Sequence, residues 1–411
     1  MRAGLIHVPG LCLVVCVLAM LAPAGAAAKG FTQTAPKNTF IIDEGYTLSW
    51  VDRAWDNHGR PTALAEDIER YEPGGGKQGV LLVDPRARYQ LMVTKIQYGI
   101  LDNLTLALGI PVVIDTVVDP RLSWEPGDYM HQLGRPYSEE DFWAWAGSMG
   151  QSRPTRWTGN RGALSDLVVG VRFRWSDYVP ALLKAAVDSS ITITGAIPTG
   201  RAADPEEVVS LGTTMWDLHT QGDLTFHMGW DKHFPDTLDG RLTLGLDLFY
   251  EVFFERSRKA ATGTLHPLLL NQAPYVGRTY KVKPGDFAGV SFEITGAPYM
   301  GPARATWLNG YDLLKARNLP PILSVALLYS FVSLQQSDWR SDLPLWDWER
   351  ERLWRPGYKN ILEGRVTLSL LRLGVPLQVY ASYRTLSLIP GRNCRAADIL
   401  STGIQIPLKF W

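Results

Sequence analysis

The last twelve residues of the chain, 400–411, alternate between apolar and polar or small side chains. Successive side chains of a β-strand point to opposite faces, so this pattern predicts a strand with one apolar face. That face carries Leu400, Thr402, Ile404, Ile406, Leu408 and Phe410, and the other carries Ser401, Gly403, Gln405, Pro407, Lys409 and Trp411. An edge strand of a soluble sheet can end a chain in the same way, so the kind of sheet has to be inferred from the rest of the sequence.

The same alternation recurs along the chain, most clearly in residues 241–255. At about 3.3 Å per residue, a strand of that length can cross a bilayer with tilt, whereas strands of soluble sandwiches usually have about 5–6 residues. Further candidate strands lie near residues 45–52, 86–100, 104–112, 166–175, 189–198, 223–231, 289–295, 322–334, 362–370 and 376–388. With the closing strand they number about twelve, and bacterial single-chain barrels have an even number of strands.

We therefore expect an all-β fold, a single-domain antiparallel transmembrane β-barrel of about twelve strands over residues 29–411, with both termini in the periplasm. The end of the chain resembles the closing strand of bacterial outer-membrane barrels, which carries a terminal aromatic residue. Here Phe410 lies on the apolar face and Trp411 is one residue further. This resemblance implies two partners, the lipid of the outer membrane and the barrel-assembly machinery, which would bind the end of the chain at Phe410 and Trp411.

The connectors between the candidate strands alternate in length. Short turns lie near residues 101–103, 176–183, 234–240 and 374–375, and long segments lie at residues 115–162, 199–218, 256–284 and 335–357. Short periplasmic turns and long extracellular loops are typical of outer-membrane barrels, so we expect extracellular loops near 115–162, 256–284 and 335–357. Residues 297–321 break the alternation, and residues 311–317 within them could form a brief helix.

Residues 1–28 have the composition of a secretory signal peptide. An apolar stretch over residues 11–21 follows a basic start, and small residues near position 28 offer a cleavage site. An uncleaved membrane anchor is the alternative, but a proline and several alanines at the end of the segment favour cleavage. Of the three cysteines, only Cys394 would then remain, so no internal disulfide is expected.

The composition also constrains the function. The mean hydropathy of −0.06 and a charged content of 20% are values of a soluble protein, yet 46% of the residues are hydrophobic and there are 15 Trp and 16 Tyr. A barrel produces this combination because lipid-facing apolar residues alternate with lumen-facing polar ones and aromatic residues gather at both interfaces. The formal net charge of +0 argues against nucleic acid as a partner.

Charged residues on the polar faces of the candidate strands are expected to point into the lumen. An Arg or Lys on the lipid face near the midplane costs about 2–4 kcal/mol, so the alternation fixes this placement. The lumen-facing candidates are Asp166, Arg172, Arg174, Asp223, His227, Asp231, Arg241, Asp247, Glu251, Glu293, Glu363, Arg365, Arg384 and Lys409. Because both signs occur, we expect ion pairs inside the barrel and weak charge selectivity.

No motif indicates catalysis or a metal site. His219, His227 and His233 are close in sequence, but their spacing matches no recognised ligand motif, so polar filling of the lumen is favoured. A hydrolase could use His227 as base and Asp223 to orient it, but neither a G-x-S-x-G elbow nor a partner serine can be identified. We therefore expect no catalytic residues, no cofactor and no metal.

Two of the long loops are rich in tryptophan, at residues 115–162 and 335–357. They either close the mouth of the barrel or lie at the outer membrane interface, the structural interpretation that we favour, or they form an aromatic vestibule for apolar solutes. Within the first, residues 138–141 (Ser-Glu-Glu-Asp) have the pattern of a helix start. The glycine-rich run 73–79 lacks the ending of a phosphate loop, so we expect a flexible loop between the first two strands.

Three segments resemble a family of outer-membrane proteins linked to the degradation of aromatic compounds, often described as phenol-pathway or transporter-like proteins. They are residues 96–111, a strand with a tight turn and a returning strand, residues 164–174, and residues 192–200 followed by 211–213. The resemblance implies an outer-membrane location and the uptake of small molecules, hydrophobic ones among them. It carries over no functional residues.

These patterns favour a channel or transporter-like barrel in the cell outer membrane for small solutes, including hydrophobic or aromatic ones. A structural or surface-interaction barrel with a filled lumen is the alternative. A lipid-modifying outer-membrane hydrolase is a more distant one and requires a serine next to His227. The chemical identity of any solute is not encoded in a recognisable motif.

Overall fold

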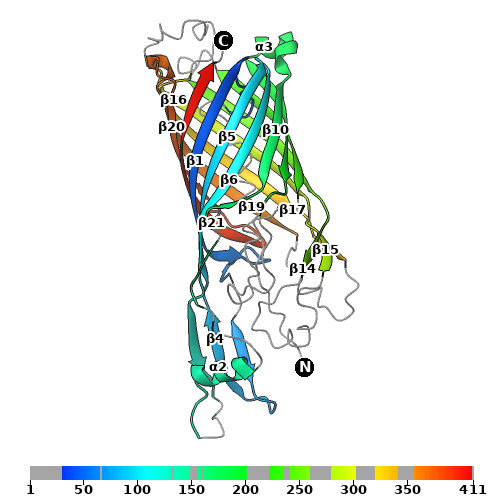
Figure 1. Ribbon diagram of the computed structural model, residues 1–411, viewed down its shortest axis with the longest axis vertical. Helices are drawn as coiled ribbons and strands as arrows, with labels where there is room; N and C mark the ends of the chain where they lie inside the picture. The colour runs from blue at the N-terminus through cyan, green and yellow to red at the C-terminus, as the bar shows by residue number, and fades with distance from the viewer. Residues whose placement is uncertain are drawn as a thin grey trace.

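Twelve strands of the described residues form one closed antiparallel barrel (Figure 1). The computed structural model describes residues 30–64, 67–128, 130, 134–148, 153, 155–159, 161–200, 222–234, 241–259, 279–301, 320–340 and 356–409. The barrel strands are β1 (Thr39–Trp55), β5 (Arg86–Leu101), β6 (Leu104–Asp119), β10 (Leu167–Arg174), β11 (Val187–Ile197), β12 (Asp223–Phe234), β13 (Leu242–Phe253), β16 (Phe287–Tyr299), β17 (Leu323–Leu334), β19 (Gly357–Ser369), β20 (Gln378–Thr385) and β21 (Cys394–Lys409). The predicted fold class is confirmed, and the expected signal peptide lies outside the described residues.

Each barrel strand pairs with the barrel strands before and after it in the chain, and pairing of β1 with β21 closes the ring. The register of this closing pair joins Thr39 to Lys409 at one end and Trp55 to Cys394 at the other. Every strand predicted from the sequence corresponds to one of these strands. Several are longer than predicted: β6, for example, continues through Val117 and Val118, which are both buried and therefore hide the two-residue period.

Burial alternates along the barrel strands as the hydrophobic pattern requires. In β13, Leu244 and Leu248 are 38% and 44% exposed, whereas Asp247 between them is 5% exposed. Because a barrel wall is one sheet thick, its exposed side chains lie on the outer face and its buried ones face the interior. The outer face is therefore an apolar belt, suited to contact with lipid.

The two ends of the barrel differ. The short-turn end holds the start of β1, the end of β21 and compact connectors, among them η1 (Ser176–Tyr178), α3 (Pro180–Lys184) and η4 (Leu371–Leu373). The opposite end, which we call the loop end, holds the long connectors. These contain β2 (Pro61–Thr62), β8 (Trp157–Gly159) and β9 (Ala163–Leu164) at the rim, and a second sheet of β14 (Arg256–Lys259), β15 (Thr279–Lys283) and β18 (Asp338–Arg340). The brief helix expected at residues 311–317 lies outside the described residues.

A small module projects from the loop end, away from the barrel (Figure 1). Its sheet consists of β3 (Ile68–Tyr71), β4 (Lys77–Val83) and β7 (Leu122–Pro126), and α2 (Glu139–Ser148) contributes to the same buried cluster. Phe142 is fully buried, with its ring centroid 5.3 Å from that of Trp124 and 5.1 Å from that of Trp143. These two tryptophans of the long loop are thus half-buried and pack against the buried cluster of the module.

Two local predictions fall within this module. The helix start indicated by residues 138–141 is confirmed, because α2 begins at Glu139. The flexible loop expected over residues 73–79 is wrong in its second half, since β4 begins at Lys77 and only the residues before it form the turn to β3. The strand forms there because β4 is the central strand of its sheet and pairs with both β3 and β7.

Candidate functional site in the barrel lumen

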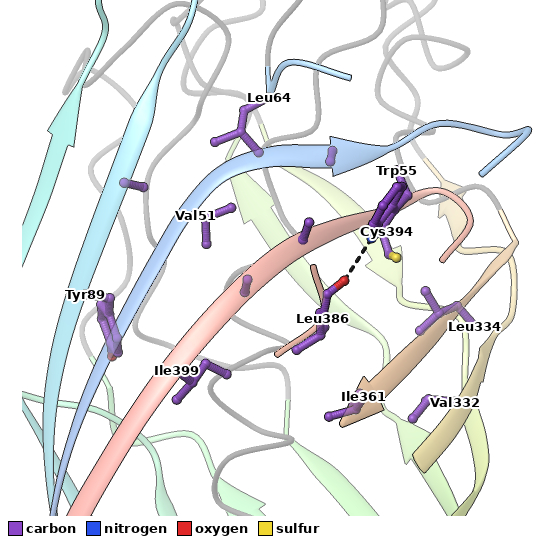
Figure 2. Close-up of a cluster of buried hydrophobic side chains, with 14 of the residues drawn as sticks. Val51, Trp55, Leu64, Tyr89, Val332, Leu334, Ile361, Leu386, Cys394 and Ile399 are labelled. Atoms are coloured by element: carbon purple, nitrogen blue, oxygen red, sulfur yellow. Dashed lines mark hydrogen bonds between the residues drawn. The ribbon is translucent and has the colours of Figure 1, made fainter. Parts of the chain in front are cut away.

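Apolar side chains cover the inner face of the barrel near the loop end, where polar residues were expected. We call the following contiguous buried set the apolar layer: Val51, Tyr89, Leu91, Val113, Phe253, Phe287, Val332, Leu334, Ile361 and Ile399. Figure 2 shows part of it, with Leu64 and Leu386 from the connectors packed against the strands. The indole Nε1 of Trp55 donates to the carbonyl oxygen of Leu386 at 2.9 Å and ties one connector to the layer. A polar solute would lose its hydration here without replacement hydrogen bonds.

An ion-pair network occupies the inner face of β16, β19 and β20. Glu363, only 3% exposed, accepts from Arg384 Nε at 2.8 Å and from Arg365 Nη2 at 3.0 Å. Arg365 also lies 3.9 Å from a carboxylate oxygen of Glu293, which accepts from the hydroxyl of Thr295 at 2.8 Å. Four of the predicted lumen-facing residues thus meet, and opposite charges offset the cost of burying them.

A second polar group lies on β1, β20 and β21. Asp43 accepts from the hydroxyl of Tyr380 at 3.0 Å and from Nε2 of Gln405 at 3.1 Å. The Tyr380 ring lies across two glycines that face each other in the register, Gly45 and Gly403, and a Cβ at either would come within 3 Å of its hydroxyl. The glycines therefore allow this ring to lie flat against the wall. None of these residues is among the lumen-facing candidates predicted from the sequence.

His227 has a different partner from the one expected. Its Nδ1 lies 2.8 Å from a carboxylate oxygen of Asp247 on the neighbouring strand, whereas Asp223 had been assigned the orienting role. The expectation fails because Asp223 and His227 are four residues apart on one extended strand, whereas Asp247 lies beside His227 across the pair. The Nε2 atom is buried, and among the described residues it has no hydrogen-bond partner, serine included.

The residues that precede β1 run along the inner face of the barrel at the short-turn end. We call residues 30–38 the N-terminal segment. The carboxylate of Asp231 accepts from the backbone N–H groups of Phe31 and Thr32, at 3.0 and 2.8 Å, and from the Thr32 hydroxyl at 2.5 Å. Further along the segment, the N–H of Ala35 donates to the hydroxyl of Thr105 on β6 at 2.7 Å. The segment therefore narrows the lumen.

Glycines in the wall make room for this segment. A Cβ on Gly229 or Gly245 would lie about 3 Å from Phe31, and a Cβ on Gly99 would lie 2.0 Å from the carbonyl oxygen of Pro36. The N-terminal segment thus packs closely against the wall at positions where a side chain larger than glycine would clash. Because the segment's sequence alone has no strand period, its position could not be predicted.

The remaining predicted residues are distributed along the wall. Asp166, Asp223 and Glu251 are buried near the loop end, and Asp166 accepts from the N–H of Gly200 at 2.7 Å. Arg174 lies at the short-turn rim, where it forms an ion pair with Asp177 at 2.8 Å. Arg241 is half-buried at the start of β13. The side chain of Lys409 lies outside the described residues.

Lys95 and Arg172 line one cavity against β5, β6, β10 and β11. Only Arg172 was predicted to face the lumen. Lys95 falls on the predicted strand 86–100, and its position there could have been inferred by extending the alternation from Gln97. In the part of the chain that the structure describes, no three His, Cys, Asp or Glu side chains gather to hold a metal ion. No described helix is long and apolar enough to cross a membrane.

A closed antiparallel barrel with an apolar outer face and charges inside defines an outer-membrane-type β-barrel with a channel-like fold. The COG4313 outer membrane channel from Pseudomonas putida F1 shares this fold, with a TM-score of 0.55 over 93% of this chain and 100% of that chain, at 9% identity. The NanC porin and a Pseudomonas aeruginosa FadL homologue give TM-scores of 0.37 and 0.31, at 8% and 9% identity. They cover 90% and 91% of this chain and 100% and 91% of their own. No family model and no curated protein matches the sequence.

Proposed function

We propose that this protein is an outer-membrane channel for small, largely apolar solutes, including hydrophobic and aromatic ones. The observation that carries the proposal is the order of surfaces along the barrel. The apolar layer at the loop end adjoins a cavity, and the N-terminal segment borders that cavity towards the short-turn end. Such an order gives a solute an apolar entrance and a polar exit.

The apolar layer would select against hydrophilic solutes. Burial of a polar group without a hydrogen bond costs roughly 2–7 kcal/mol, whereas burial of apolar surface contributes about 25 cal/mol per Å². An apolar solute that moves between the side chains of the apolar layer buries its own apolar surface against them. The free energy contributed by apolar burial is therefore largely kept. The selectivity we propose is therefore for apolarity, with little discrimination of shape.

The proposal includes a location and two partners. The signal peptide at residues 1–28 would direct the chain through the inner membrane and be removed. The barrel-assembly machinery would recognise the end of the chain at Phe410 and Trp411, and outer-membrane lipid would cover the exposed belt. These remain predictions from the sequence.

Uptake of the apolar dye phenylnaphthylamine by Gram-negative cells tests the channel proposal. Cells that display the folded barrel should take up the dye several times faster than cells without it. Val332→Thr in the apolar layer should slow uptake, and Val366→Thr on the outer face is the matched control. Val332 is 6% exposed and Val366 is 47% exposed, so the same change is made on opposite faces. Uptake equal to that of cells without the barrel would reject transport.

One observation favours the second candidate, a surface-interaction role. The module of β3, β4, β7 and α2 has its own buried cluster and projects from the loop end. A protein whose function lay at its surface would retain that function with a blocked lumen. Failure of dye uptake in a correctly folded protein would therefore support this candidate.

A further inference from the structure

The inward-facing residues of β13 include one aromatic ring outside the apolar layer, that of Phe249. Side chains of a strand alternate between its faces, and towards the short-turn end the inward positions of β13 carry Asp247, Gly245 and Thr243. Phe249 is half-buried, whereas Phe253 of the apolar layer is 3% exposed. Exceptions to the local sequence pattern are commonly functional or strained sites, so the surroundings of this ring should show its role.

The ring of Phe249 lies along the wall of the barrel. Gly289 of β16 stands directly opposite Phe249 in the register, and a Cβ at Gly289 would lie 2.3 Å from Cζ of the ring and 2.4 Å from its Cε1. The ring therefore reaches across the strand pair and covers the glycine. On β12, the ring of His227 has its centroid 5.6 Å from that of Phe249, with the two planes inclined by 32°. Because Phe249 is on the inner face, the exposed part of its ring is open to the lumen.

No hydrogen bond accounts for the position of Phe249, since its side chain has no polar atom. Tyr380 differs in this respect: its ring also covers wall glycines, but its hydroxyl donates to Asp43 at 3.0 Å. The ring beside Phe249 is fixed, because Nδ1 of His227 lies 2.8 Å from a carboxylate oxygen of Asp247. A ring that is held between fixed neighbours loses little freedom when a second ring stacks on it, which favours such stacking.

Phe249 lies next to the apolar layer, on the side of the short-turn end. It packs against the buried cluster that contains the layer. It is four residues from Phe253 on β13, and the ring centroid of Phe253 is 5.0 Å from that of Phe287. Four residues of a strand span about 13 Å. A solute that leaves the apolar layer along this part of the wall therefore meets the ring of Phe249 next.

We infer that Phe249 is a specificity-determining residue of the lumen, on which the aromatic ring of a solute stacks. Aromatic rings prefer offset-stacked or edge-to-face contacts with centroids about 4.5–7 Å apart, and such contacts are stronger than burial of the same apolar area alone. A saturated ring of the same size makes only the apolar contact. The inference rests on the proposed function and makes it more specific: the apolar layer selects for apolarity, and Phe249 distinguishes aromatic rings from saturated ones.

Saturation-transfer NMR on the purified, folded barrel in a deuterated non-ionic detergent tests this inference with two neutral probes of similar size, benzamide and cyclohexanecarboxamide. The wild type should bind benzamide about threefold more tightly than cyclohexanecarboxamide. Phe249→Leu keeps an apolar side chain without an aromatic face, so it should bind the two probes with similar affinity. Phe249→Tyr keeps the aromatic face and should retain the preference. A residue that only filled the wall would change the stability of the barrel without changing this ratio of affinities.

Phe292→Leu is the matched control, because it makes the same change on the outer face of β16, where Phe292 is 51% exposed. It should leave the preference for benzamide unchanged. Equal affinity of the wild type for the two probes, no measurable binding, an unchanged preference in Phe249→Leu, or loss of the preference in Phe249→Tyr or Phe292→Leu would overturn the inference. Dye uptake without a preference for benzamide would leave the channel standing without this role of Phe249. A preference that depends on Phe249, without dye uptake, would establish a binding surface in a barrel that is no channel.

Discussion

Asp43 and Glu44 are neighbours in the sequence but lie on opposite faces of β1. Asp43 is 3% exposed and accepts two hydrogen bonds inside the barrel. Glu44 projects from the outer face, where one carboxylate oxygen accepts from the hydroxyl of Thr94 at 2.6 Å. Its other oxygen has no hydrogen-bond partner among the described residues. A carboxyl group in the apolar belt lowers the stability of the barrel. Glu44 lies there because the alternation of β1 places residue 44 on the outer face when Asp43 points inward.

Replacement of these two residues by leucine should therefore have opposite effects. Glu44→Leu should stabilise the barrel in lipid by about 1 kcal/mol, since a carboxylate on the lipid face costs less than the 2–4 kcal/mol of Arg or Lys. Asp43→Leu should destabilise it, because Tyr380 and Gln405 lose their acceptor. Urea unfolding in lipid vesicles measures both. A loss of stability in both variants would show that Glu44 does not face lipid.

Glu363 forms ion pairs with two half-buried arginines, Arg365 and Arg384. Glu363→Ala should lower the free energy of unfolding by about 3–5 kcal/mol, because Arg384 would lose this carboxylate partner and Arg365 would keep only the more distant carboxylate of Glu293. Glu69→Ala is the control: it breaks an exposed ion pair with Lys77 and should cost less than about 1 kcal/mol. Urea unfolding again provides the measurement. Equal small losses in the two variants would mean that water already solvates the arginines.

At the scale of elements, the carboxylate of Asp231 accepts three of the hydrogen bonds that hold the N-terminal segment. Asp231→Ala removes the acceptor of three hydrogen bonds from Phe31 and Thr32. The segment should then leave the wall more often, and single-channel conductance in planar bilayers should rise. Asp188→Ala is the matched control, since Asp188 lies opposite Asp231 in the register but bonds to His233. Unchanged conductance in both variants would show that the segment does not limit the path.

The helix α2 should respond to acid. Arg135 donates two hydrogen bonds to Asp141, and together with the backbone N–H of Ser138 it holds the pKa of that carboxyl well below its usual range. Because the pKa is lower in the folded state, the stability that Asp141 contributes is present above its ordinary pKa of about 3.9 and is lost as the pH falls through the folded value. Tryptophan fluorescence should follow the resulting loosening of the module.

Arg135→Gln provides the test of this assignment. Without the guanidinium, the acid transition of the module should move upward, towards the ordinary carboxyl range of about pH 4. The unfolding of the barrel itself should not shift, because α2 packs in the separate cluster around Phe142. Identical acid transitions in the wild type and the variant would exclude the Arg135–Asp141 pair as the cause.

At the scale of the whole molecule, stability depends on closure of the ring by β1 and β21. Closed barrels leave no unpaired strand edge and typically resist detergent until heated. We expect the protein in the outer-membrane fraction, with faster migration on a gel before heating than after it. Recovery as a soluble periplasmic monomer without detergent would contradict the membrane assignment.

The strands could be predicted from the sequence because their period is a local property. One lipid-covered face requires an apolar residue at every second position, and segments such as residues 241–255 show this without knowledge of any neighbour. The helix start at residues 138–141 is local in the same sense. Strand ends were less predictable: in β6 the ladder continues through Val117 and Val118, where both faces are covered and the period disappears.

The sequence by itself determined the class of fold, because the alternation of apolar and polar side chains is a property of single residues. The inward placement of charges such as Glu363 and Arg172 is predicted on the same basis. Only the tertiary structure decided the partners of these charges. Asp247, and not Asp223, lies beside His227, because partners come from adjacent strands whose register is set by the whole ring. The same holds for the apolar layer, the N-terminal segment on Asp231 and the cavity at Lys95, since each is formed by residues distant in sequence that only ring closure brings together.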